Sequence, residues 1–170
     1  MLKINIDNLP KLLAALNEVG ELHVPCENKA GKVDFTKWNL EKRPRFDITL
    51  TSKSAKDLFF PQVEDLLTFK TEGKNIEVID TRSETEDFVI FGVRACDVKS
   101  FEVLDRVFLT EPVDSYYASR REKGIIVSTA CSKPSETCFC KTFGISPEEP
   151  EGDVTTWKTE DEIFFKANTS

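Results

Sequence analysis

Five cysteines are the residues of this sequence whose type and spacing most clearly indicate chemistry. Three of them, Cys131, Cys138 and Cys140, fall within the polar stretch CSKPSETCFC. A fourth, Cys96, follows the apolar run FVIFGV after two intervening residues. Thiolates gathered in this way can bind zinc or an iron–sulfur cluster. These four thiols are therefore candidate ligands of one metal centre.

The competing interpretation is simple burial, because free cysteines are among the most buried residue types. Burial is reasonable for Cys96 and for Cys26, which follows Pro25 and which we interpret as structural. It is less persuasive for three cysteines that lie among Ser, Lys, Pro, Glu and Thr. The start of the chain has no apolar signal segment, so we expect a cytoplasmic protein, and five is an odd number. Both points disfavour a disulfide framework.

The spacing of the cysteines alone leaves the metal open. Tetrahedral zinc needs sulfurs about 3.8 Å apart, since each Zn–S bond is about 2.3 Å long. Residues i and i+2 of an extended segment lie about 6.6 Å apart, which suits the wider span of a cluster, although a tight turn shortens that distance. The pattern is neither the bacterial ferredoxin run nor the paired C-x2-C pattern of many zinc sites. Zinc in a structural or interaction domain therefore remains the alternative.

Composition argues against several other classes of protein. The chain carries 23 basic and 30 acidic residues, a net charge of −7, which is the wrong balance for binding nucleic acid or an anionic membrane surface. The sequence contains no apolar run of about 18 residues, the length that a membrane-spanning helix needs. The usual glycine-rich phosphate motifs are absent from the sequence. A thiol enzyme that uses Cys96 at a helix N-terminus lacks an obvious base, because the single histidine, His23, is remote in sequence.

Hydrophobic periodicity predicts the elements that position the cysteines. Residues 87–93 and 124–130 are predicted to be buried strands, and two helices lie between them, the first capped by Asp97 with an apolar stripe from Val98 to Phe108. This strand–helix–strand crossover, spanning residues 87–130, predicts two parallel strands in one sheet. We therefore expect an α/β (or α+β) fold with a mixed sheet. The other predicted elements are a helix capped by Asn8 and ending at Gly20, and strands at residues 21–25, 32–38, 46–51, 65–70, 75–80, 154–159 and 162–167.

Cys96 and Cys131 each follow one of the two predicted parallel strands. The carboxyl ends of parallel strands line the same edge of an open sheet. If the strands are neighbours, both thiols lie on one rim, and the loop after Cys131 returns Cys138 and Cys140 to it.

Four stretches of the sequence resemble the iron–sulfur β subunits of archaeal sulfhydrogenase and the related iron–sulfur subunit of anaerobic sulfite reductase. They are SAKDLFFPQVEDLLTF, FGVRACDVKSFEVLDRVFL, DSYYASRRE and CSKPSETCFC, and together they span most of residues 54–140. FGVRACD and the final CFC are the more specific parts of the resemblance.

The resemblance implies that Cys96, Cys131, Cys138 and Cys140 hold a cluster of the [4Fe-4S] type. It implies an electron-transfer module without catalysis of its own, which passes electrons from a flavoprotein subunit to a hydrogenase or siroheme reductase subunit, or in the reverse direction. Arg94, Arg120 and Arg121 match the family pattern, and one of them is expected to donate hydrogen bonds to cluster sulfur or to offset cluster charge. The alternative for these arginines is an ion pair with Asp97, Glu102 or Asp105.

The sequence departs from that family in one respect. The C-x2-C-x2-C-x3-C-P runs of a dicluster ferredoxin region are absent. We therefore expect residues 1–170 to form a single N-terminal cluster-binding domain, a fragment with the ferredoxin-like region downstream.

Overall fold

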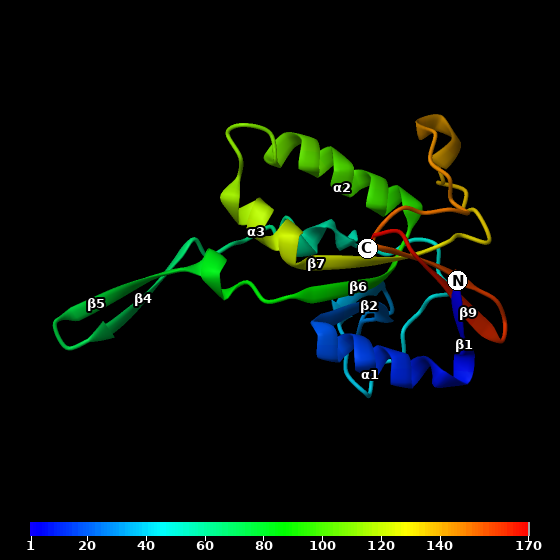
Figure 1. Ribbon diagram of the computed structural model, residues 1–170, viewed down its shortest axis with the longest axis horizontal. Coiled ribbons are helices and arrows are strands. Elements are labelled where there is room, and N and C mark those ends of the chain that lie inside the picture. Colours follow the sequence, from blue (N-terminus) through cyan, green and yellow to red (C-terminus); the bar gives the residue numbers. More distant parts are fainter. Residues whose placement is uncertain (170) are drawn as a thin grey trace.

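The computed structural model describes residues 1–169 and confirms a mixed α/β fold (Figure 1). In the described part of the chain, seven strands form one sheet in the order β1-β9-β8-β7-β6-β2-β3. The strands β2, β6, β7 and β8 run parallel to one another, and the outer strands are antiparallel to their neighbours. The bounds of these strands are Leu2–Asn5 (β1), Glu21–Glu27 (β2), Val33–Lys37 (β3), Phe88–Val93 (β6), Gly124–Thr129 (β7), Val154–Lys158 (β8) and Glu162–Ala167 (β9).

Helices cover both faces of the sheet (Figure 1). The helix α1 (Leu9–Val19) packs on one face, and α2 (Ala95–Phe108) and α3 (Ser115–Lys123) lie on the other. The chain runs from β6 through α2 and α3 to β7, which pairs with β6 in parallel, so the predicted crossover is confirmed. Among residues 1–169, no helix is long and apolar enough to cross a membrane.

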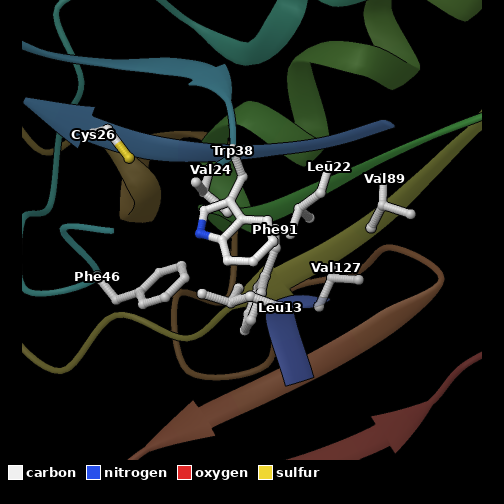
Figure 2. Packing of buried hydrophobic residues seen from close by; sticks show 9 residues of the cluster. All are labelled: Leu13, Leu22, Val24, Cys26, Trp38, Phe46, Val89, Phe91 and Val127. Carbon is white, nitrogen blue, oxygen red and sulfur yellow. The ribbon is translucent and has the colours of Figure 1, made fainter. Parts of the chain in front are cut away.

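Every residue of β6 is buried, because the strand contributes side chains to both layers of the core. Val89 and Phe91 pack toward α1 with Leu13, in the cluster that Figure 2 shows. Phe88 and Ile90 alternate with them and pack toward α2 and α3. Burying each such side chain contributes about 1.5–3 kcal/mol, so the centre of the sheet is the most strongly held part of the fold.

The carboxyl end of β6 bends at Gly92. The φ angle of Gly92 is 101°, and the β6–β7 register shifts between Phe91 and Val93. A Cβ at position 92 would lie 2.9 Å from the Phe46 ring and 3.1 Å from Pro25. Glycine is therefore required here by backbone conformation and by space, and the resulting bulge directs the chain into α2.

Residues 46–51 do not form the strand that the sequence predicts. Phe46 is buried against Phe91, with ring centroids 4.7 Å apart. The carbonyl groups of Phe46 and Ile48 accept hydrogen bonds from the guanidinium of Arg94. Because a side chain satisfies these acceptors, the segment needs no partner strand and remains irregular.

Two local predictions about α2 are corrected, and the predicted N-cap position of α1 is confirmed. Arg94, not Asp97, is the N-cap residue of α2, and Asp97 lies in its first turn, where it accepts a hydrogen bond of 2.6 Å from Ser54. Asn8 is the N-cap of α1 but makes no capping hydrogen bond with its side chain. Val107 belongs to the predicted stripe of α2 yet is 62% exposed.

The strands β4 (Leu67–Glu72) and β5 (Asn75–Asp80) form a separate hairpin that projects from the body of the molecule (Figure 1). The Tyr116 hydroxyl fixes its base by donating a 3.0 Å hydrogen bond to the Leu66 carbonyl. Alternation along the two strands places an exposed apolar row on one face of the hairpin. Its residues are Leu67, Phe69, Ile76 and Val78.

Candidate metal centre

The parallel pairing of β6 and β7 brings Cys96 and Cys131 to one edge of the sheet. Val93 lies opposite Ser128 near the carboxyl ends of the two strands. Cys96 is the second residue of α2, and Cys131 follows the end of β7 at Thr129. The positions expected from the sequence are thus the observed ones, and both side chains are partly buried.

The other two cysteines lie in the connection between β7 and β8. It contains a short 3-10 helix, Cys140–Phe143, and the Ile145 amide donates a hydrogen bond of 2.9 Å to the Cys140 carbonyl. The Cys131 amide in turn donates to the Pro147 carbonyl at 2.8 Å, so the two ends of the loop are tied together. Figure 1 shows this segment in amber, standing out beyond the N-terminal end of α2. Cys131, Cys138 and Cys140 line one cavity of about 420 Å³ within the loop.

Burial and neighbouring groups shift the pKa of three of these thiols. Burial raises the pKa of Cys96 to about 11, with smaller contributions from Asp97, Cys140 and Cys131. Burial also raises the pKa of Cys131, and the charge of Arg94 opposes this effect. The exposed Cys138 has a lowered pKa because the side chain and the backbone of Ser135 donate hydrogen bonds to its sulfur. Cys131 and Cys140 contribute to the raised pKa of Cys96, and Cys138 and Cys140 contribute to the raised pKa of Cys131.

Arg94 connects the two strand ends directly. Its guanidinium donates hydrogen bonds to the Ala130 carbonyl at 2.9 Å and to the Phe46 carbonyl at 2.9 Å. Its charge and a hydrogen bond oppose the larger effect of burial, which raises the pKa of Cys131. Arg94 therefore braces the chain on either side of the candidate centre and places a positive charge beside one thiol.

Four thiols are a donor set of the kind that binds zinc or an iron–sulfur cluster. No three His, Cys, Asp or Glu side chains within residues 1–169 are close enough together to hold one metal ion. Cys131, Cys138 and Cys140 line one cavity, and Cys96 lies at the neighbouring start of α2. Four thiolates are the usual ligand set of an iron–sulfur cluster. A cluster needs a larger separation between its thiolates than tetrahedral zinc does.

The chain is similar to one curated protein whose function is named. The chain is 32% identical over 142 residues to the "Sulfhydrogenase 2 subunit beta" of Pyrococcus furiosus, a match that covers 84% of this chain. The chain matches the sulfhydrogenase β-subunit family in part. It spans 40% of the length of that relative. No family model matches the chain, and no solved structure does.

The structure does not bring Arg120 and Arg121 to the cysteines. Both lie at the end of α3, next to the start of β7, whereas Cys131 follows the end of β7. Arg120 forms an ion pair with Glu64, and Arg121 pairs with Asp105 at 3.1 Å. For Arg121 this is one of the ion pairs that the sequence offered as the alternative to cluster binding.

Cys26 lies apart from the candidate centre. It is 3% exposed and belongs to the core cluster on the α1 side of the sheet (Figure 2). Burial raises the pKa of its thiol, as expected for a structural cysteine.

Sequence reasoning missed Ser135. The Ser135 amide and hydroxyl lie within hydrogen-bonding distance of the Cys138 sulfur. The spacing of Ser and Cys three residues apart in a polar turn is the signal that would have pointed to this contact.

Proposed function

We propose that this chain is an electron-transfer module of an oxidoreductase complex, in which Cys96, Cys131, Cys138 and Cys140 bind one [4Fe-4S] cluster. The convergence of Cys96 and Cys131 at one sheet edge, with the other two cysteines in the adjoining loop, carries the proposal. The partial match to a sulfhydrogenase β subunit supports it. When bound, such a cluster accepts and gives up one electron at a time.

The residues around the cysteines would keep the cluster in place and offset part of its negative charge. Arg94 would offset part of its negative charge while it keeps the loops before Ile48 and after Ala130 in place. The α2 N-terminus, where Cys96 lies, adds a favourable partial positive charge. These features would favour the reduced state and raise the reduction potential.

We also propose that electrons enter and leave through partner subunits, because a one-electron centre held by thiolates needs an electron donor and an electron acceptor. The candidate partners are a flavoprotein subunit together with a hydrogenase or siroheme reductase subunit of an anaerobic complex. Phe139 and Phe143 support a contact near residues 131–145. Their rings pack edge to face with centroids 5.4 Å apart, and their side chains are 50% and 67% exposed.

Metal analysis of the chain purified without oxygen tests the ligand set. We expect iron and acid-labile sulfide, a brown colour and an electron paramagnetic resonance signal after chemical reduction. Serine at Cys96, Cys131, Cys138 or Cys140 should remove most of the iron, because each thiolate is a direct ligand. Cys26→Ala is the matched control and should keep the full content, since Cys26 lies in the core.

Two results would contradict the proposal. Colourless protein with stoichiometric zinc would identify a structural zinc domain instead. Full iron content in both Cys138→Ser and Cys140→Ser would exclude the proposed ligands. The partner proposal is tested separately, by co-purification of the full-length native protein followed by cross-linking, and a free monomer would contradict it.

A further inference from the structure

Ser135 makes two polar contacts with the sulfur of Cys138, one of the candidate ligands. Its backbone N–H donates to Cys138 Sγ, with nitrogen and sulfur 3.1 Å apart. Its hydroxyl oxygen lies 3.3 Å from the same sulfur. A thiolate can only accept hydrogen bonds, so the hydroxyl becomes the donor once Cys138 is ionised.

A backbone hydrogen bond between Cys138 and Ser135 fixes the geometry of this contact. The Cys138 amide donates to the Ser135 carbonyl at 3.1 Å, which closes a turn across Glu136 and Thr137. Because the turn is closed at the backbone, Cys138 Sγ points back to the Ser135 amide. The Thr137 hydroxyl lies 3.3 Å from the Ser135 hydroxyl and can hold its orientation.

The position of Cys138 explains why such support matters. Cys96 and Cys131 are partly buried and follow strands of the main sheet, whereas Cys138 is exposed in a loop. An exposed cysteine side chain on a loop can adopt three staggered χ1 rotamers, and two donors from one residue favour one of them.

We propose that Ser135 is a positioning residue that holds the Cys138 thiolate toward the cluster and raises the reduction potential of the cluster. The inference rests on the proposed function. Reduction adds one electron, taken from an added reductant, and no bond forms or breaks at Cys138. The negative charge on the cluster and its ligand sulfurs increases in this step, so the two hydrogen bonds become stronger in the reduced state.

The test compares three variants with the unsubstituted chain, each purified without oxygen and analysed for iron and sulfide. Ser135→Ala removes the hydroxyl and keeps the backbone N–H. Ser135→Thr keeps both donors. Ser132→Ala removes an exposed hydroxyl from the same cavity wall and is the matched control. The measurement is the midpoint potential from a redox titration followed by electron paramagnetic resonance.

We expect Ser135→Ala to reduce the equilibrium ratio of reduced to oxidised cluster by about three- to tenfold at a fixed potential, as the loss of one hydrogen bond predicts. A tenfold change corresponds to a midpoint about 59 mV more negative for a one-electron couple. Ser135→Thr and Ser132→Ala should keep the original potential. If Ser135→Ala fails to load while Ser135→Thr loads, the positioning role is confirmed by iron content alone.

The outcomes separate this inference from the function on which it rests. If Ser135→Ala contains the cluster and its midpoint potential is unchanged, the proposed role of Ser135 is wrong and the cluster assignment stands. Failure of both Ser135 variants to load, with Ser132→Ala loaded, assigns Ser135 a packing role and also overturns the inference. A chain that contains zinc, or no metal, overturns the proposed function and the inference together.

Discussion

The Arg94 guanidinium donates a hydrogen bond of 2.9 Å to the carbonyl of Ala130, a residue 36 positions later in the chain and adjacent to Cys131. It also bonds the carbonyl groups of Phe46 and Ile48. One side chain thus joins the start of α2, the end of β7 and an irregular segment. A planar group with several donors in a fixed fork can satisfy such a set, and a lysine ammonium cannot reproduce its geometry.

Replacing Arg94 should therefore weaken the fold as well as the candidate centre. We expect Arg94→Lys to lower the free energy of unfolding by about 2–4 kcal/mol, because several carbonyl groups lose a charged donor. Urea denaturation monitored by circular dichroism measures the effect. Arg106→Lys, on the exposed side of α2, is the control and should change stability little. Equal stability of the two variants would show that the contacts of Arg94 contribute nothing.

Removal of the metal should destabilise the loop of residues 131–145 more than it destabilises the sheet. A centre held by Cys96 and by the loop cross-links two segments that are distant in sequence, so its binding free energy adds to stability. We expect a chelator or an oxidant to lower the melting temperature and to speed hydrogen exchange in residues 131–145 first. The strands β6 and β7 should remain protected, since their cores do not depend on the loop. An unchanged exchange profile for residues 131–145 after metal loss would contradict this expectation.

Gly92→Ala should be strongly destabilising. The φ angle of 101° is unfavourable for alanine, and the new Cβ would lie 2.9 Å from the Phe46 ring. The two effects together should cost about 3 kcal/mol or more. Thermal unfolding measures this cost, and Gly73→Ala provides the comparison. The φ angle of Gly73 is 61°, but a Cβ at that position would meet no heavy atom within 4 Å, so that variant should lose only the conformational part.

His23 should make stability depend on pH around neutrality. Burial lowers the pKa of His23 below its ordinary value of 6.5, although Glu21, whose carboxylate lies 3.0 Å away, opposes the shift. The unfolded chain then binds a proton more readily than the folded chain does. The free energy of unfolding should consequently fall as the pH is lowered through 6.5 toward the folded-state pKa.

The His23 prediction is measured by urea denaturation at several pH values between about 7.5 and 5.5, a range that brackets the ordinary pKa of histidine. His23→Gln keeps a donor for Glu21 but does not titrate, so its stability should vary less over the same range. His23 is the single histidine of the chain, which makes the comparison direct. Parallel pH profiles for the two proteins would refute the prediction.

The local elements can be predicted wherever the hydrophobic periodicity is strong. The α1 helix, the strands β2 and β3 and the run from β6 to β7 are predicted from apolar spacing and capping signals, because these depend on nearby residues. The placement of Cys96 and Cys131 on one edge also followed from the sequence, since a crossover connection makes the two strands parallel.

The remaining features depend on contacts between residues that are distant in sequence, so local patterns do not predict them. Residues 46–51 have the composition of a strand, but their carbonyl groups bond to Arg94. Arg120 and Arg121 are close to the cysteines in sequence, yet the six residues of β7 carry Cys131 to the opposite end of the strand. The support that Ser135 gives to Cys138 depends on how the loop closes, which no periodic pattern encodes.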